Sequence, residues 1–283
     1  MLSAAPQPRD RPIAVFDSGV GGLTVLQELL VELPHEDFVY LGDTARFPYG
    51  ERGAGELCGL ALQIAELLLA RRAKLLVVAC NAASASALAA LRERMLSTTL
   101  GVEVVGVIDP ESRLAAQATA SGRIGLLATT ATVRSGAYDR AVAAYAPAAR
   151  LTSVACPDLA PIIQRGFPFD RAVVDTVRGY CDPLREAGVD TVILGCTHYP
   201  LIAPMLQRML GPRVRLITSG RSLALTVAAS LEAAQLGALR RGEGDYRFLC
   251  TGDVEAFREV GSRFLQMPIE HIEHVALPLA EAA

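Results

Sequence analysis

The chain has 283 residues, of which 51% are hydrophobic, so it is long enough for one large domain or two ordinary ones with a real core. Its formal net charge is -3 at pH 7, and it has no basic stripe with interleaved aromatic residues, so composition does not favour a nucleic-acid partner. Apolar runs fall short of the roughly 20 residues of a membrane span. Residues 1–12 lack the pattern of a signal peptide. We expect a soluble protein of the cytoplasm with no membrane partner.

Short aliphatic runs alternate with longer segments of helical period, which is typical of βαβ units with parallel strands. The predicted strands are residues 13–16, 38–41, 75–79, 102–107, 123–128, 151–154, 191–194 and 214–217. The predicted helices are residues 23–32, 51–72, 84–95, 111–119, 131–145, 169–187 and 222–239. Because the strands are apolar on both faces, helices should cover both sides of each sheet. The fold class is therefore α/β.

Two strand ends, in GVIDPESR and LITSGRSL, each lead through a turn into a new helix, where the chain could cross between domains. We predict two similar, doubly wound parallel-sheet lobes. Lobe A comprises residues 1–108 and 218–283, and lobe B comprises residues 109–217. Ligands bind at the carboxyl ends of the strands in such sheets, so the active site should lie in the cleft between the lobes.

Two similar stretches end an aliphatic strand on a cysteine. VVACNAAS contains Cys80 and Asn81, and ILGCTHYP contains Cys196, Thr197 and His198. A reactive thiol needs a helix amino terminus or a nearby base; Cys80 precedes a predicted helix, and Cys196 has His198 close by. Two thiols on opposite walls of a cleft suit removal of a proton from one face of a carbon and its return on the other face.

Other interpretations of these residues stay open. Any one cysteine could be a small buried hydrophobe. Cys196 and His198 could bind a metal, although no other histidine has ligand-like spacing. A Cys-His hydrolase or acyl transferase would leave Cys80 unexplained. The single lysine, Lys74, stands before a predicted strand, which is a poor position for a Schiff base with pyridoxal phosphate. We expect no cofactor and no metal.

Two further strand ends carry turn residues. In FDSGVGGLTVL, Asp17 and Ser18 lead into a glycine-rich turn whose free amide groups could hold an anion, with a bound carboxylate favoured over a nucleotide phosphate. In YLGDTARFPYG, Tyr49 and Gly50 lie in a loop at a strand end, where binding groups accumulate. The alternative is that both stretches only form tight turns.

Taken together, these motifs resemble those of the cofactor-independent glutamate racemase family. The segments FDSGVGGLTVL, YLGDTARFPYG, VVACNAAS, IGLLATTATVRSGAY, ACPDLAPIIQRG, LGCTHYPL and FLCTGDVEAFREVGSRFL occur in the family's order along the whole chain. The resemblance implies two α/β lobes and interconversion of L- and D-glutamate by 1,1-proton transfer without a cofactor. It also implies a supply of D-glutamate for peptidoglycan, and a homodimer.

The resemblance implies roles for individual residues as well. Cys80 and Cys196 match the two acid/base thiols, Asp17 matches the residue that assists Cys80, and His198 matches the residue that assists Cys196. The positions that match substrate-binding residues are Asp17, Ser18, Tyr49, Gly50, Asn81, Ala82, Thr129, Thr132, Thr197 and His198.

The chain departs from the family's usual pattern in two places. Ala82 stands where a threonine usually follows Cys-Asn, so that only a backbone amide remains as donor. Gln164 and Arg165 stand where acidic residues commonly support the histidine, which changes how His198 is tuned. Two alternatives follow: an aspartate racemase, a class that tends to have glutamate at the position of His198, and an amino-acid-binding protein on the same scaffold that has lost turnover.

Overall fold

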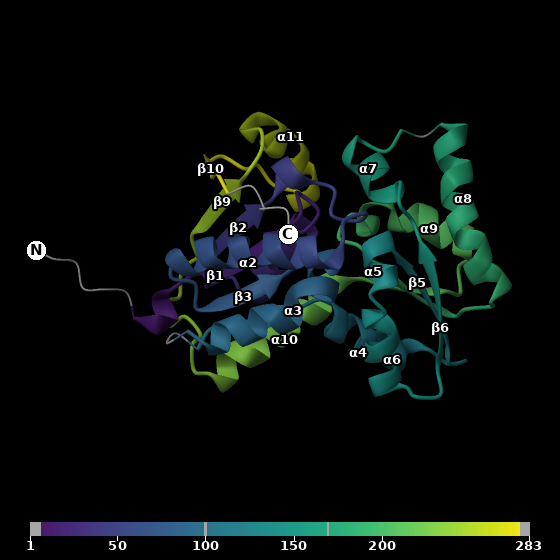
Figure 1. The fold of residues 1–283 in the computed structure, drawn as a ribbon, viewed down its shortest axis with the longest axis horizontal. Coiled ribbons are helices and arrows are strands. Elements are labelled where there is room, and N and C mark those ends of the chain that lie inside the picture. Colours follow the sequence, from purple (N-terminus) through teal and green to yellow (C-terminus); the bar gives the residue numbers. More distant parts are fainter. Residues whose placement is uncertain (1–6, 99–100, 169, 278–283) are drawn as a thin grey trace, which may run out of the picture.

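The computed structural model describes residues 7–98, 101–168 and 170–277, which form two parallel sheets (Figure 1). The six-stranded sheet, here the large sheet, has the order β10 (Ile272–His274), β9 (Tyr246–Cys250), β2 (Phe38–Gly42), β1 (Ile13–Asp17), β3 (Leu75–Val78) and β4 (Glu103–Gly106). The four-stranded sheet, here the small sheet, has the order β6 (Arg150–Ala155), β5 (Arg123–Ala128), β7 (Thr191–Gly195) and β8 (Arg215–Ile217). Within the described ranges, every strand pairing is parallel. The predicted α/β class is confirmed.

Strand β1 shows why the large sheet is apolar on both faces. Successive side chains of a strand point to opposite faces. Ile13 and Val15 pack in one cluster with side chains from α1 (Leu23–Glu32), α10 (Ser219–Ala233) and α11 (Val254–Leu265). Ala14 and Phe16 pack in a second cluster with α2 (Ala54–Ala70) and α3 (Asn81–Leu96). Helices therefore cover both faces of this sheet.

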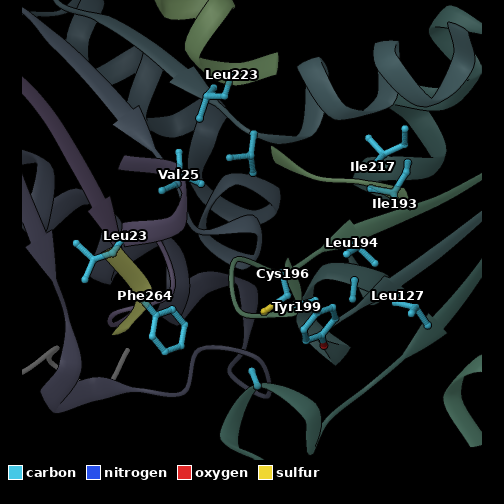
Figure 2. Close-up of a cluster of buried hydrophobic side chains, with 14 of the residues drawn as sticks. Leu23, Val25, Leu127, Ile193, Leu194, Cys196, Tyr199, Ile217, Leu223 and Phe264 are labelled. Atoms are coloured by element: carbon cyan, nitrogen blue, oxygen red, sulfur yellow. The ribbon is translucent and has the colours of Figure 1, made fainter. Parts of the chain in front are cut away.

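The first of these clusters continues into the small sheet. Figure 2 shows Leu23, Val25, Leu223 and Phe264, from helices on the large sheet, in one cluster with Leu127, Ile193 and Leu194 of β5 and β7. The small sheet is accompanied by α4 (Ile108–Ala118), α5 (Thr130–Arg134), α6 (Ala137–Tyr145), α7 (Leu159–Gln164), α8 (Arg171–Glu186) and α9 (Ala203–Leu210). The two sheets share a continuous apolar core.

The structure corrects three of the predicted helices. The segment 131–145 is not one helix, because Gly136 has φ +62° and separates α5 from α6. The helix predicted to begin at residue 84 begins at Asn81, because Cys80 caps it. The helix predicted over 222–239 runs from Ser219 to Ala233, after which Gln235 adopts φ 55°. The helix predicted from residue 169 is α8, and Phe169 lies outside the described residues.

Among the α-helices and β-strands of the described residues, β9, β10, α7, α9 and α11 were not predicted. The outer strands give weak signals, because β10 has three residues and is mostly exposed, and β9 begins with the polar pair Tyr246 and Arg247. The chain passes between the sheets after β4, into α4, and after β8, through Thr218 into α10. These passages coincide with the proposed lobe boundaries at 108 and 218, which stay a prediction. No helix in the described ranges is long and apolar enough to cross a membrane.

Candidate active site

A cavity lies where the carboxyl ends of strands from both sheets meet. Loops after β1, β2 and β3 contribute to it from the large sheet, and loops after β5, β6 and β7 contribute from the small sheet. The predicted site residues that line it are Ser18, Tyr49, Gly50, Cys80, Asn81, Ala82, Thr129, Cys196, Thr197 and His198. The structure therefore brings together residues that are up to 180 positions apart, as in the contact between Asp17 and Thr197.

Two predicted residues do not line the cavity but contact a residue that does. Asp17 is fully buried, and its Oδ1 accepts a hydrogen bond from Thr197 Oγ1 at 3.3 Å. Thr132 is also buried, and its Oγ1 lies 3.0 Å from Thr129 Oγ1. Both residues reach the cavity through a threonine that lines it.

Cys80 is held at the amino terminus of α3. Its Sγ accepts a hydrogen bond from the Ala83 amide at 3.5 Å, which makes the thiol the cap of the helix. Burial raises the pKa of Cys80 to about 12; the charge of Asp17 raises it further, and the Ala83 amide opposes both effects. Cys80 is therefore a thiol at neutral pH.

Cys196 follows β7 directly and faces His198. Its Sγ lies 4.0 Å from His198 Nδ1, and burial raises the pKa of this thiol well above its usual value. On the other side of the ring, His198 Nε2 lies 2.9 Å from Gln164 Oε1. Because a carbonyl oxygen only accepts, Nε2 carries the ring hydrogen and the lone pair of Nδ1 faces the thiol. His198 is thus oriented as a base for Cys196.

The ring of His198 is enclosed by aromatic side chains. It stacks on Phe47 with centroids 5.4 Å apart, and its edge meets Phe264 at 5.1 Å. This burial lowers the pKa of His198 to about 3. The imidazole is therefore neutral at physiological pH. Gln164, a position where the chain departs from the family pattern, still supplies the acceptor that fixes the ring's tautomer.

The glycine-rich turn after β1, for which the sequence left open an anion site or a tight turn, surrounds Asp17. The Gly19 amide donates to Asp17 Oδ2 at 3.1 Å. Burial raises the pKa of Asp17, and the amides of Gly22 and Gly19 oppose that shift. These amides therefore donate hydrogen bonds to the Asp17 carboxylate. A Cβ on Gly21 would lie 2.3 Å from Thr197 Oγ1, so only glycine permits the close approach of this turn to the loop after β7.

The loop that contains Tyr49 and Gly50 is anchored at both of its ends. The Tyr49 hydroxyl donates to Asp43, which also accepts from Arg46 Nε at 2.7 Å. The Gly50 carbonyl accepts from the Ala131 amide of α5 at 2.7 Å. The loop therefore joins the large sheet to a helix of the small sheet at the edge of the cavity.

Sequence reasoning missed some residues of the wall and a cluster behind it. The additional wall residues are Phe47, Pro48, Glu51, Pro157, Ala160, Pro161 and Gly195. Most lie in YLGDTARFPYG and ACPDLAPIIQRG, so their place after a strand end was an available signal. The cluster joins Asn81 Nδ2 to Tyr138 at 2.8 Å and to Glu111 at 3.2 Å. No local pattern marks it, because its members come from separate helices.

The single lysine serves a structural role away from the cavity. Lys74 Nζ is buried and donates to Glu36 and to the carbonyl groups of Arg9 and Leu236. It precedes β3 and so lies at the opposite end of that strand from Cys80. Over the described part of the chain, no three His, Cys, Asp or Glu side chains group as metal ligands.

Comparison with known proteins identifies the family. Residues 33–227 match the profile of the Asp/Glu/Hydantoin racemase family. A glutamate racemase of Beutenbergia cavernae is 45% identical over 274 residues, which cover 93% of this chain and 92% of that protein. The chain belongs to the glutamate racemase family.

Solved structures of glutamate racemases agree with this assignment. An isoform from Bacillus anthracis is 36% identical and superimposes with a TM-score of 0.90, covering 96% of this chain and 99% of that one. The Francisella tularensis glutamate racemase, solved in complex with D-glutamate, is 32% identical with a TM-score of 0.87, covering 95% and 98% of the two chains. The family resemblance and the fold expected from the sequence are confirmed.

Proposed function

We propose that this protein is a glutamate racemase that interconverts L- and D-glutamate, with Cys80 and Cys196 as its two acid/base groups. The observation that carries the proposal is that both buried thiols line one cavity, each at the carboxyl end of a strand from a different sheet. Support for the substrate comes from the relatives, which are glutamate racemases, and from one of them solved with D-glutamate. The reaction class is amino-acid isomerisation.

The proposed reaction is a two-base proton transfer at the α-carbon. The thiolate of one cysteine takes the α-proton, and the electron pair of the broken C–H bond stays on carbon. The thiol of the other cysteine then donates its proton to the opposite face, so the two groups end with exchanged protonation states. A reversible inversion needs an acid and a base of similar strength. Both groups are cysteine thiols, and burial raises the pKa of each in the same direction, which supports their use as such a pair.

Each thiol needs a way to lose its proton. His198 Nδ1 faces Cys196 and places an acceptor for that proton beside the thiol; the pKa of the ring, which burial lowers to about 3, must rise when substrate binds for the transfer to occur. The charge of Asp17 raises the pKa of Cys80, and burial raises the pKa of Asp17 itself, so a proton taken up by Asp17 would remove that charge and make Cys80 easier to deprotonate. The α-ammonium group of the substrate adds a positive charge between the thiols, which favours their thiolate forms. We therefore assign the assisting roles to Asp17 and His198.

Donors around the cavity can hold the carboxylates of glutamate. Hydroxyl groups of Ser18, Thr129 and Thr197, the Asn81 amide, the Tyr49–Gly50 loop and the backbone at Ala82 line the same wall. Thr132 supports Thr129 from behind. Preorganised donors of this kind stabilise the negative charge that develops when the α-proton leaves. The substrate is a small amino acid, and no step requires a cofactor.

Two alternative functions, an aspartate racemase and a binding protein, are disfavoured by His198 and its contacts. An aspartate racemase is disfavoured because a histidine, not a glutamate, follows Cys196 and Thr197. A binding protein without turnover is disfavoured because Gln164 keeps the ring oriented and both thiols remain in the cavity. Neither departure, at Ala82 or at Gln164, removes an acid/base group.

We further propose that the D-glutamate formed here supplies peptidoglycan synthesis, and that the protein acts in the cytoplasm as a homodimer. These points rest on family membership. Growth of a bacterial strain that requires D-glutamate, rescued by this chain but not by a variant lacking both thiols, would support the first. Analytical ultracentrifugation of the purified protein tests the second; a monomer at micromolar concentration would contradict it.

The catalytic proposal is tested by incubating the purified protein with L-glutamate or D-glutamate in the presence of a chelator and without pyridoxal phosphate. Circular dichroism of the substrate should decay to zero from either enantiomer. Decay with aspartate alone would support an aspartate racemase instead. Saturable glutamate binding without decay would support a binding protein.

A further inference from the structure

Glu111 is a buried carboxyl group without a cation partner. It lies on α4 with 0% exposure, and none of the ion pairs in the described residues includes it. Its carboxyl oxygens accept hydrogen bonds from the Tyr138 hydroxyl, the Ser219 hydroxyl and Asn81 Nδ2. Burial raises the pKa of Glu111 to about 8, against the opposing effect of these hydrogen bonds.

Glu111, Tyr138, Ser219 and Asn81 form a hydrogen-bonded cluster, and one of its members lines the active-site cavity. Asn81 follows Cys80 and lines the same cavity. Its Nδ2 donates to Tyr138 at 2.8 Å and to Glu111 at 3.2 Å, so both amide hydrogens are used. Its Oδ1 is buried and has no hydrogen-bond partner among the described residues. A buried polar atom without a partner is rare in proteins, and here it belongs to a residue that lines the cavity.

The cluster joins helices from both sheets close to the two thiols. Asn81 begins α3 and Ser219 begins α10, which both pack on the large sheet, whereas Glu111 and Tyr138 lie on α4 and α6 beside the small sheet. Burial raises the pKa of Tyr138, and the charges of Glu111 and Cys196 raise it further. The cluster therefore lies behind the wall that carries Cys80, and one of its members, Tyr138, is within electrostatic reach of Cys196.

Stability alone does not account for this arrangement. Removing a carboxyl group from water is costly, and replacing buried ionic groups by apolar residues of similar volume is often neutral or stabilising. What an apolar residue could not do is hold the Asn81 amide in one orientation. Resting on the proposed racemase function, we propose that Glu111 is a positioning residue that, with Tyr138, fixes Asn81 so that its Oδ1 accepts a hydrogen bond from the α-ammonium group of glutamate.

The test compares Glu111→Leu and Glu111→Gln with the unaltered protein in steady-state racemisation. Glu111→Leu should raise KM about tenfold or more for both enantiomers and change kcat less, because the substrate loses an oriented acceptor. Glu111→Gln keeps the shape and an acceptor oxygen, so it should restore most of the affinity. Between about pH 6 and about pH 9, KM should also depend less on pH in Glu111→Gln than in the unaltered protein, because glutamine does not titrate. The titratable groups that act on the cluster are Glu111, Tyr138 and, at longer range, Cys196.

Asp109→Asn is the matched control. Asp109 lies on the same helix and accepts a hydrogen bond from Tyr145 of α6 at 2.7 Å, but this pair is exposed and does not reach the cavity. Its KM should equal that of the unaltered protein. If Glu111→Leu does not fold, Tyr138→Phe carries the test: it should raise KM because it removes one partner of Asn81, and an unchanged KM would overturn the inference.

The outcomes separate this inference from the proposed function. Folded Glu111 variants with the KM and pH dependence of the unaltered protein would overturn the inference and leave Glu111 a packing role. No racemisation by the unaltered protein would contradict the proposed function instead. In that case D-glutamate binding, measured by calorimetry, tests Glu111 directly, and equal affinity in Glu111→Leu would overturn the inference.

Discussion

At the scale of residues, the two thiols occupy equivalent places but have different neighbours. Cys80 caps α3 and is influenced by Asp17, whereas Cys196 faces a neutral His198. Both were predictable because each directly follows an apolar strand in the sequence. Glu111 and Tyr138 were not, because only the packing of α4 on α6 brings them to Asn81. Residues that line the cavity next to strand ends can be predicted from the sequence more readily than the residues that hold them in place from behind.

Replacing either thiol tests the residue-scale account. Cys80→Ser and Cys196→Ser should each lower kcat by at least about 100-fold and leave the fold intact, because a serine hydroxyl is a much poorer acid/base group. Since the enantiomers are equally stable, kcat/KM must fall equally in both directions. Cys58→Ser, on α2 and outside the cavity wall, is the control and should retain full activity. Racemisation at the unaltered rate by either active-site variant would show that the two-base account is wrong.

His198 should make the protein less stable in mild acid. Its pKa is about 3 in the folded protein and 6.5 in the reference state. Between these values the unfolded chain binds a proton that the folded chain does not, so the free energy of unfolding falls as pH decreases from about 6.5 towards 3. Urea denaturation across this range should show a shallower decline for His198→Asn than for the unaltered protein. Equal slopes would mean that the histidine is not buried in its neutral form.

At the scale of elements, the functional groups depend on where strands end and helices begin. Helix α3 starts three residues earlier than predicted, at Asn81, because a cysteine thiol takes the capping role that serine or aspartate usually has. The break between α5 and α6 was missed because Gly136 lies inside an otherwise helical pattern. Most strands were predicted because they form apolar runs, whereas β9 and β10, at one side of the large sheet, carry polar residues.

The contact between the turn before α1 and the loop after β7 supplies the element-scale prediction. A Cβ on Gly21 would lie 2.3 Å from Thr197 Oγ1 and 2.5 Å from His198 Nδ1. Gly21→Ala should displace that loop and lower kcat/KM by about 10- to 100-fold, because small misplacements of reacting groups are costly. Gly59→Ala is the control, since nothing lies within 4 Å of its added Cβ. Unchanged kinetics in Gly21→Ala would mean that the loop position does not control the reaction.

At the scale of the whole molecule, the site exists because two sheets present their strand ends to one another. The sequence predicted this cleft from the βαβ pattern, since ligands bind at the carboxyl ends of parallel strands. The continuous apolar core was not predictable, because Leu23 and Phe264 join one cluster with side chains of the small sheet only after α1 and α11 have packed (Figure 2). Both sheets therefore contribute to the stability of one site.

A ligand that contacts both sheets should stabilise the whole molecule. With D-glutamate at 100 times its Kd, the free energy of unfolding should rise by about 2.7 kcal/mol, since the ligand binds only the folded chain. The rise should appear as a higher midpoint in denaturation by urea. Glutamine has the same shape without the side-chain charge and should have a much smaller effect. Equal stabilisation by glutamine and glutamate would contradict recognition of the second carboxylate.

The measurement that tests the central claim most directly is the fate of the α-hydrogen in heavy water. Each enantiomer of glutamate is incubated separately with the unaltered protein, and substrate and product are separated early in the reaction and examined for deuterium. Two thiols on opposite faces predict deuterium in the product and little in the remaining substrate, because the donating thiol carries a hydrogen from solvent while the abstracting one holds the substrate's own. Product that retains the original hydrogen, or deuterium appearing equally in remaining substrate and product, would contradict the two-thiol account.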